Sequence, residues 1–293
     1  MNFLTILLAI TILEAYGQLG FIQRDGWVAE WHQRLTKLSF LSAYSSLRLA
    51  FFILIPAVVV HVLASALSQN QFGFFVFVLE LVVLLYALGR GNLDTQIALL
   101  NSDLEQDALQ KAFNDASLVN TTNREGDATS SEDPRNKAFA ALPYRAFERS
   151  FAVIFWFFFF GAPAALVYRL LALHGDLDLQ DRQNVALGSD KQISATRLLW
   201  LLEWIPARLL GFTLGLVGSF SHSMAHLWEL IFSGQTATAE LLRRCVHGAL
   251  GDINSNEPKS VAVTKAAIDA INSLFRRAMT AWLVGIAILV ILI

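Results

Sequence analysis

The sequence predicts an all-α fold: a polytopic membrane helical bundle with four spans, one or two broken or re-entrant segments, and cytoplasmic helical loops. Three observations predict this class. The segment Phe151–Tyr168 holds no charged residue, and apolar runs of about 18 or more residues are typical of membrane-spanning helices. The 293-residue chain is 55% hydrophobic and 16% charged, whereas soluble domains carry about 25% charged residues. No segment has the alternating pattern of a strand. The apolar run and the low content of charged residues make the lipid bilayer the first partner that the sequence predicts.

The predicted spans are four apolar segments, taken in chain order. They are Leu47–Leu67, Phe72–Gly89, Phe151–Leu173 and Ala278–Ile293. Pro56 lies in the middle of the first, which membrane helices tolerate when neighbouring groups bond the freed carbonyl. The uncharged link Ser68–Gln71 is so short that the second span must return antiparallel to the first. The last span covers only about 24 Å at about 1.5 Å per residue, which predicts a thin crossing.

Two further apolar segments are long enough to cross the membrane but contain charges. The segments and their polar residues are Phe3–Ile22 with Glu14, and Leu198–Phe220 with Glu203, Pro206 and Arg208. Each is a span, a re-entrant hairpin or an interfacial helix. The N-terminal run is apolar like the core of a signal peptide, but it lacks preceding basic residues and a small-residue cleavage site, so we expect it to be retained.

Basic residues predict the orientation of the spans, because they concentrate on the cytoplasmic side. They precede the first span and flank the loop Gly89–Ser150, which places both regions in the cytoplasm. The third span then runs outward, and His174–Arg197 faces outside. If Leu198–Phe220 crosses, the basic stretch Ser221–Arg277 is cytoplasmic. This agreement with the charge rule favours crossing or deep insertion of that segment.

The regions between the spans are predicted to contain short helices and one disordered linker. Asp94–Phe113 has apolar residues at helical spacing, whereas residues 114–137 are rich in Ser, Thr, Asn, Asp and Gly and cannot build a core. His222–Phe232 and Ala237–Leu250 are predicted as helices, the second ended by a glycine. With the linker inside it, the whole chain (1–293) is expected to form a single integral membrane domain.

Ionisable residues at membrane depth are the first candidates for function, because inserting one at the centre of a membrane helix costs about 2.5–3.5 kcal/mol of free energy. They are Glu14, Glu80, Glu203 and Arg208. Such groups usually face a bundle interior or a wet cavity, so each marks either a ligand, proton or partner site or a carboxyl bonded to a neighbouring helix. Glu203 and Arg208 lie about 140° apart on an ideal helix, with Pro206 between them. They are either snorkelling charges of an interfacial helix or a polar seam in which Arg208 pairs with Glu14 or Glu80.

Other chemical signals are weak or missing. His222, His226 and Glu229 share one helical face at a spacing that can hold a metal. No further His or Cys lies near them in the sequence, so no metal is predicted. Nothing matches a phosphate-binding loop, a nucleophile elbow or a zinc-protease motif. A net charge of −2 gives no reason to expect nucleic acid. The single cysteine, Cys245, excludes an intrachain disulfide and is expected to be buried. Gly211-x-x-x-Gly215 is typical of close helix packing.

Two blocks of the sequence resemble a known family. Tyr144–Leu171 (YRAFERSFAVIFWFFFFGAPAALVYRLL) resembles the membrane segment shared by AmpE proteins and the CobD/CbiB cobinamide-phosphate synthases. Leu202–Ser219 (LEWIPARLLGFTLGLVGS) resembles their second shared block, an acidic residue followed by x-I-P-A-R. An N-terminal apolar helix interrupted by an acid, here Glu14, is a further similarity. The resemblance follows the order of the segments over most of the chain.

Two departures place the chain nearer to AmpE proteins than to the cobalamin enzymes. Gln23–Trp31 (QRDGWVAEW) lacks their Asp-Pro and His-Pro-Val signature, and Arg145–Ser150 (RAFERS) stands where they carry Glu-x-x-Ala-Glu-Asn. The resemblance therefore implies a multi-pass protein of the inner membrane of Gram-negative bacteria, encoded beside the AmpD amidase and linked to β-lactamase induction and antibiotic resistance. It implies a sensory or signalling role, with ATP or a muropeptide-type ligand suggested by family analogy alone.

These observations support three hypotheses about function. The leading one is a non-enzymatic regulator that couples cell-wall recycling to β-lactamase induction, with recycling components or a wall fragment as partner. The second is a membrane enzyme related to the amide-forming cobinamide-phosphate synthases, with a changed active site. A transporter is the third, disfavoured because no inverted repeat of broken helices is found. The candidate pocket residues are Glu14, Glu80, Arg149, Glu203, Pro206 and Arg208. In the enzyme reading, Glu14, Arg149, Glu203 and Arg208 converge on a substrate. The sequence predicts no reaction and no oligomeric state.

Overall fold

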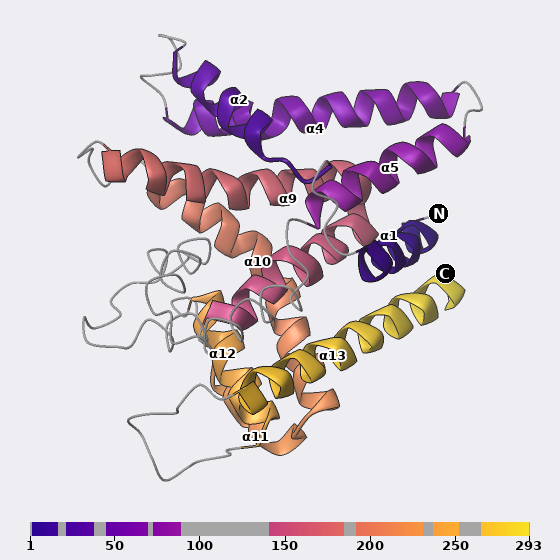
Figure 1. Ribbon diagram of the computed structural model, residues 1–293, viewed down its shortest axis with the longest axis vertical. Helices are drawn as coiled ribbons and strands as arrows, with labels where there is room; N and C mark the ends of the chain where they lie inside the picture. The colour runs from indigo at the N-terminus through magenta and orange to yellow at the C-terminus, as the bar shows by residue number, and fades with distance from the viewer. Residues whose placement is uncertain are drawn as a thin grey trace. The chain divides into compact units, whose positions relative to one another are not determined.

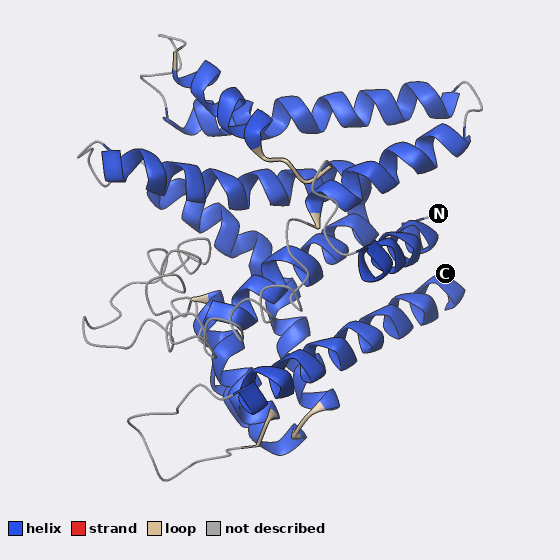
Figure 2. Ribbon diagram, in the orientation of Figure 1, coloured by secondary structure: helices blue, strands red, loops and turns tan. Residues whose placement is uncertain are grey.

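Helices account for nearly all of the part of the chain that the structure describes (Figure 2). The structure is a computed structural model, and it describes residues 2–16, 22–37, 45–69, 73–88, 141–184, 192–230, 237–251 and 265–292. No strand occurs within these ranges, so the predicted all-α class is confirmed. The predicted linker at 114–137 and the predicted helix Asp94–Phe113 lie outside the described residues.

The helices follow one another along the chain as labelled in Figure 1. In order they are α1 (Asn2–Tyr16), α2 (Gly26–Thr36), α4 (Ser45–Gln69), α5 (Gly73–Ala87), a π-helical turn (Phe147–Phe151), α9 (Ala152–Asn184), α10 (Gln192–Val217), α11 (Phe220–Leu230), α12 (Thr238–Ala249) and α13 (Lys265–Leu292).

Four of the described helical segments are long and apolar enough to cross a membrane. They are Ser46–Gln69, Ala141–Gly175, Ala195–Val217 and Asp269–Leu292. On α4 the side chains of Leu54, Val58 and Val62 are each more than half exposed, and a continuous apolar face of this kind suits lipid rather than water. The protein is a membrane protein.

The spans differ from the predicted set in three places. The charged segment Leu198–Phe220 lies largely within one helix, α10, which runs through Pro206. The last crossing is not thin, because α13 is 28 residues long and so extends about 42 Å. By contrast α1 and α5 are 15 residues each, about 22 Å, which is shorter than a hydrocarbon core of about 30 Å. The full span predicted at Phe72–Gly89 is therefore a shorter apolar helix in the structure.

The third predicted span is not straight. Within α9 the backbone of Gly161 has φ 75° and ψ −168°, a region that is essentially restricted to glycine. Pro163 follows two residues later and has no N–H with which to continue the helical ladder. Figure 1 shows the ribbon of α9 changing direction sharply at this break. The predicted loop His174–Arg197 is also mostly helix, since α9 continues to Asn184 and α10 begins at Gln192.

The described helices fall into two compact units, each formed by two separate stretches of chain. Unit 1 comprises Met1–Arg90 and Ala152–Leu202. In it α9 packs against α4, α5 and α1, while α1 and α4 each pack against α5, and α2 packs against α4. Figure 1 shows α5 returning alongside α4, as the short link predicts. Fully buried apolar side chains at the centre include Phe52, Leu84, Phe157 and Leu170. The single-domain prediction stays a prediction.

Unit 2 comprises Gly91–Phe151 and Glu203–Ile293. Its closest packing is between α11 and α12. The C-terminal half of α10 approaches them closely, because a Cβ on Gly218 would lie 2.5 Å from the Ala249 carbonyl oxygen and one on Gly215 would lie 2.7 Å from Met224. The glycine stripe is therefore used for packing, as predicted. The ends of α12 agree closely with the predicted helix, and Gly251 follows it with φ 66°.

Two further contacts complete the core of unit 2. The Cys245 side chain is fully buried, as expected, and burial raises the pKa of its thiol to about 12. The indole N–H of Trp282 on α13 donates to the Thr213 hydroxyl on α10 at 3.1 Å. The same indole packs edge-on against Phe151, with ring centroids 5.2 Å apart. These contacts fix α13 against the residues of the π-helical turn.

Candidate functional site

Glu203 is the centre of a buried polar cluster in unit 2. Its side chain is on α10 and only 3% exposed. The Tyr144 hydroxyl donates a hydrogen bond to Glu203 Oε1 at 2.8 Å, and Tyr144 is itself 5% exposed. This bond joins the two blocks that carry the family resemblance. The structure gives Glu203 a hydrogen-bonded partner from another helix, and the two readings of its role stay predictions.

Local backbone features set this cluster apart from ordinary helix packing. Pro206 lies one turn beyond Glu203 and removes the hydrogen bond that its N–H would have made to the Leu202 carbonyl. In the segment that carries Tyr144, Phe147–Phe151 forms a π-helical turn, a rare geometry that is frequent at functional sites. Glu148 in this turn is 2% exposed, and Arg149 is half-buried.

Arg208 turns towards its own helix. The guanidinium lies 4.3 Å from the centroid of the Trp204 ring and donates to the Trp204 carbonyl oxygen at 3.1 Å. A cation over an aromatic face is stabilised by about 0.5–1 kcal/mol at a partly exposed site. Glu14 is exposed on α1 and Glu80 is half-buried on α5, both in unit 1. Pairing of Arg208 with either acid, and the convergence that the enzyme reading requires, stay predictions.

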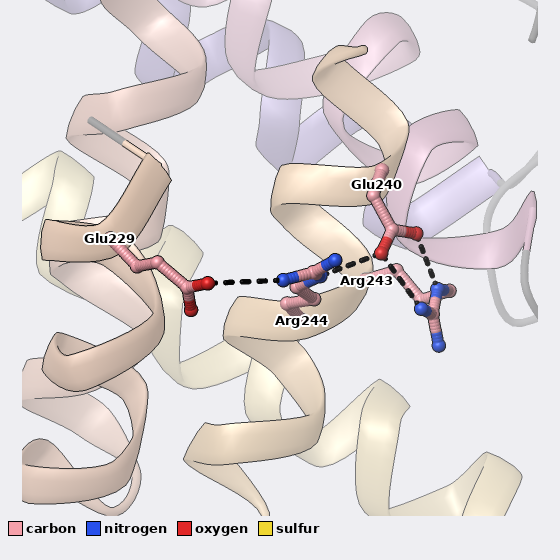
Figure 3. Close-up of polar contacts among 4 residues, drawn as sticks. All are labelled: Glu229, Glu240, Arg243 and Arg244. Carbon is pink, nitrogen blue, oxygen red and sulfur yellow. Dashed lines mark hydrogen bonds and ion pairs between the residues drawn. The ribbon is translucent and has the colours of Figure 1, made fainter. Parts of the chain in front are cut away.

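The weak metal candidates do not form a metal centre within the described residues, where no group of three or more His, Cys, Asp or Glu could hold an ion. His222 is exposed and lies 3.0 Å from the Ser219 hydroxyl through its Nδ1. Glu229 pairs instead with Arg244 of α12 at 3.8 Å, and Arg244 donates to Glu240 at 2.7 Å (Figure 3). These residues therefore connect α11 to α12 through ion pairs.

A second polar cluster, in unit 1, was missed by the sequence analysis. Asp25, at the N-terminal end of α2, accepts a hydrogen bond from the Tyr86 hydroxyl at 3.2 Å and pairs with Arg169 at 3.4 Å. The Arg169 side chain is 8% exposed and that of Asp25 30%. Arg169 had the appearance of a charge flanking an apolar run, whereas it lies inside α9. The cluster draws Asp25, Tyr86 and Arg169 from three different helical regions of the unit.

Two buried histidines lie beside each other in the same unit. His32 on α2 and His174 on α9 are each 4% exposed, and their ring centroids are 5.3 Å apart. Both rings also pack edge-on against Phe52 of α4. Because Asp25 and His32 are seven residues apart they share one face of α2, which is the sequence signal that would have indicated a polar face there. The two clusters of unit 1 thus connect α2 to α9.

Comparison with known proteins adds one decisive match. The sequence model of the family described as regulatory signalling modulator protein AmpE matches residues 1–292. The chain belongs to the AmpE family. No curated protein and no solved structure matches the chain. The AmpE family gives this membrane protein a regulatory signalling role, and the expected resemblance is confirmed over essentially the full length.

Proposed function

We propose that this AmpE-family protein modulates β-lactamase induction from the bacterial inner membrane, by recognising an intermediate or a protein of cell-wall recycling. The polar cluster of unit 2, with Tyr144 and Glu203 at its centre, serves as the recognition site. The family description as a signalling modulator supports the regulatory part of the proposal. The inner membrane and the link to wall recycling come from the resemblance.

One observation carries the placement of the site. Glu203 is 3% exposed and held by the Tyr144 hydroxyl, although a carboxyl at this depth is costly to bury. An apolar residue would fill the same space at lower cost, so we take the pair to serve a polar task. That task involves recognition of a polar group, since Arg149 and Arg208 in the same unit are half-exposed and able to donate further hydrogen bonds.

The proposal is tested by inducible β-lactamase activity in a strain in which deleting the gene changes induction. Glu203→Gln and Tyr144→Phe keep the shape of each side chain but remove the charge or the hydroxyl. We expect both variants to reproduce the deletion phenotype at normal protein levels. The matched control is Tyr86→Phe, which removes the phenolic hydrogen bond to a carboxylate in unit 1. Wild-type induction by both unit 2 variants would exclude this cluster as the recognition site.

A further inference from the structure

Arg145 is a buried arginine whose charge is not balanced by the described residues. It precedes the π-helical turn and is 5% exposed. Its Nε is fully enclosed and has no hydrogen-bond acceptor. Within the described ranges no hydrogen bond, ion pair or ring contact involves its guanidinium. The other charged residues named in this unit 2 cluster each make at least one interaction, although Arg149 Nε is also buried without an acceptor.

Two buried carboxyls, Glu148 and Glu203, belong to the same unit, and within the described residues neither forms an ion pair with Arg145, although Glu148 Oε2 has no hydrogen-bond partner. Glu203 accepts the hydrogen bond from Tyr144, the residue next to Arg145 in sequence. Glu148 and Arg149 each make interactions of their own. Arg149 is four residues from Arg145, so the two guanidinium groups share one helical face, where like charges repel. The repulsion between these two arginines therefore favours the arrival of a negative group at this face.

An unbalanced guanidinium in this position is costly. Arginine does not lose its proton in proteins, so it cannot become neutral as a buried lysine or carboxyl can. Removing a charge from water costs several kcal/mol unless a counter-charge and further hydrogen bonds replace the water. Arginines near membrane surfaces often avoid this cost by reaching into water. At 5% exposure Arg145 does not do so.

We propose that Arg145 is the binding residue for an oxyanion, a carboxylate or a phosphate, with Arg149 on the same helical face as a second donor. The planar guanidinium matches either group through two parallel N–H donors. This inference rests on the proposed function in one respect, that the unit 2 cluster is the recognition site, and it names the chemical class of the ligand. The π-helical turn, which begins two residues after Arg145 and contains Arg149, sets their relative direction.

The oxyanion has two natural sources that share this chemistry. One is the phosphate of an anionic lipid headgroup, which a residue at the start of a membrane-spanning segment can reach. The other is a carboxylate of a soluble cell-wall fragment. Both would place a negative charge against Arg145, so the experiment needs one probe for each source and a neutral counterpart of each probe.

The test measures thermal unfolding and probe affinity of the purified full-length protein in non-ionic detergent. The lipid probe is phosphatidylglycerol, with phosphatidylcholine as its control. The soluble probe is a muramyl tripeptide with free carboxylates, with its methyl ester as control. The variants are Arg145→Gln and Arg145→Lys, and the matched control is Arg243→Gln, which alters an exposed arginine already paired with Glu240.

At least one charged probe should raise the melting temperature of the wild-type protein, as a ligand of the folded state does. Arg145→Gln should weaken its binding by about tenfold or more, the effect of losing a charge-assisted pair of hydrogen bonds. Arg145→Lys should bind with intermediate affinity, and Arg243→Gln should bind like wild type. Without a probe, Arg145→Gln should melt at or above the wild-type temperature, because it removes an uncompensated charge.

Three outcomes would overturn the inference. The first is that the wild-type protein binds neither charged probe. The second is that Arg145→Gln binds the charged probe as tightly as the wild-type protein does. The third is that, without a probe, Arg145→Gln melts below the wild-type temperature while Arg243→Gln does not, which would reveal a structural partner of Arg145. Binding of only one probe identifies the source of the oxyanion and supports the inference. If binding depends on Arg145 while Arg145→Gln cells induce β-lactamase normally, the anion site stands and the proposed function fails.

Discussion

The polar cluster of unit 1 and that of unit 2 use the same contact between a tyrosine hydroxyl and a carboxylate, but they differ in how their charges are compensated. In unit 1, Asp25 receives both the Tyr86 hydroxyl and the Arg169 guanidinium. In unit 2, Glu203 receives the Tyr144 hydroxyl, while Arg145 forms no ion pair within the described residues and its Nε has no hydrogen-bond acceptor. The first arrangement has its counter-charge in place, although Arg169 Nε has no hydrogen-bond partner, whereas the second favours an added anion.

The difference suggests a division of roles. An ion pair that joins α2 to α9 holds two helices at a fixed position, and its loss should appear as lost stability. An arginine without a counter-charge adds no stability to the empty protein, and its loss should appear in binding.

The largest loss of stability should follow from breaking the unit 1 ion pair. Arg169→Met removes the cation and leaves Asp25 with only the Tyr86 hydrogen bond. Breaking a buried pair costs about 3–5 kcal/mol, and because Asp25 is 30% exposed we expect about 3 kcal/mol. The measurement is reversible unfolding in mixed detergent micelles. Asp25→Asn combined with Arg169→Met should recover part of the loss. A stability unchanged by Arg169→Met would show that unit 1 does not depend on the pair.

The break in α9 should be the next most sensitive position. At Gly161 the backbone adopts φ 75° and ψ −168°, so Gly161→Ala should cost about 1–3 kcal/mol through backbone strain. Crowding is not the reason, because the nearest atom to an added Cβ is 3.8 Å away. Gly285→Ala on α13 is the control, since nothing lies within 4 Å of its added Cβ, and it should be neutral or stabilising. Equal effects at the two positions would argue against a strained Gly161.

The tyrosine pair compares the two clusters directly. Tyr86→Phe and Tyr144→Phe each remove a hydrogen bond to a carboxylate, at 3.2 Å and 2.8 Å respectively. Each should lower the free energy of unfolding by about 1.5 kcal/mol, at the lower end for a bond to a charged group. Only Tyr144→Phe should change β-lactamase induction. If both variants change it in proportion to their instability, the unit 2 cluster has no role beyond folding.

Parts of this arrangement follow from the sequence because charges inside apolar runs are conspicuous. Glu203 and Arg208 stand out in this way, and both lie in unit 2. The pairing of Asp25 with Arg169 does not, because both residues stand at the edges of apolar runs and resemble flanking charges. Their contact depends on how α2 packs in unit 1. Likewise, the absence of a counter-charge at Arg145 is a property of the folded chain, and nothing in its sequence neighbourhood reveals it.

The break at Gly161 illustrates a different limit. The sequence Gly161-Ala-Pro163 is compatible with a straight membrane helix, since such helices tolerate both residues when neighbours compensate the backbone. Only the positive φ at Gly161 shows that the helix is interrupted. The glycine stripe Gly211-x-x-x-Gly215 was predictable for the opposite reason. Its spacing places small side chains on one helical face, and only close packing makes use of that pattern.

The smallest effect should come from the partly exposed ion pairs of Glu240 with Arg243 and Arg244 within α12, which provide a stability contrast for both clusters. Burial acts to raise the pKa of Glu240, but the hydrogen bonds from Arg243 and Arg244 outweigh it and hold that pKa below its usual range. A carboxyl whose pKa is lower in the folded than in the unfolded state stabilises the protein above its unfolded value of about 4.3. That contribution is lost as the pH falls through the lower, folded value.

Replacing Glu240 by Gln tests this contribution. The wild-type protein should be slightly more stable than Glu240→Gln near pH 7, by less than about 1 kcal/mol for partly exposed pairs, and the gap should close as the solution is acidified below about pH 4. Salt should also narrow the gap, because it screens exposed charges. The matched variant Glu30→Gln removes the partner of Arg34 in a pair whose two side chains are more than two-thirds exposed. It should show an even smaller gap. A gap that persists at low pH would mean that the Glu240 carboxylate is not the source of the difference.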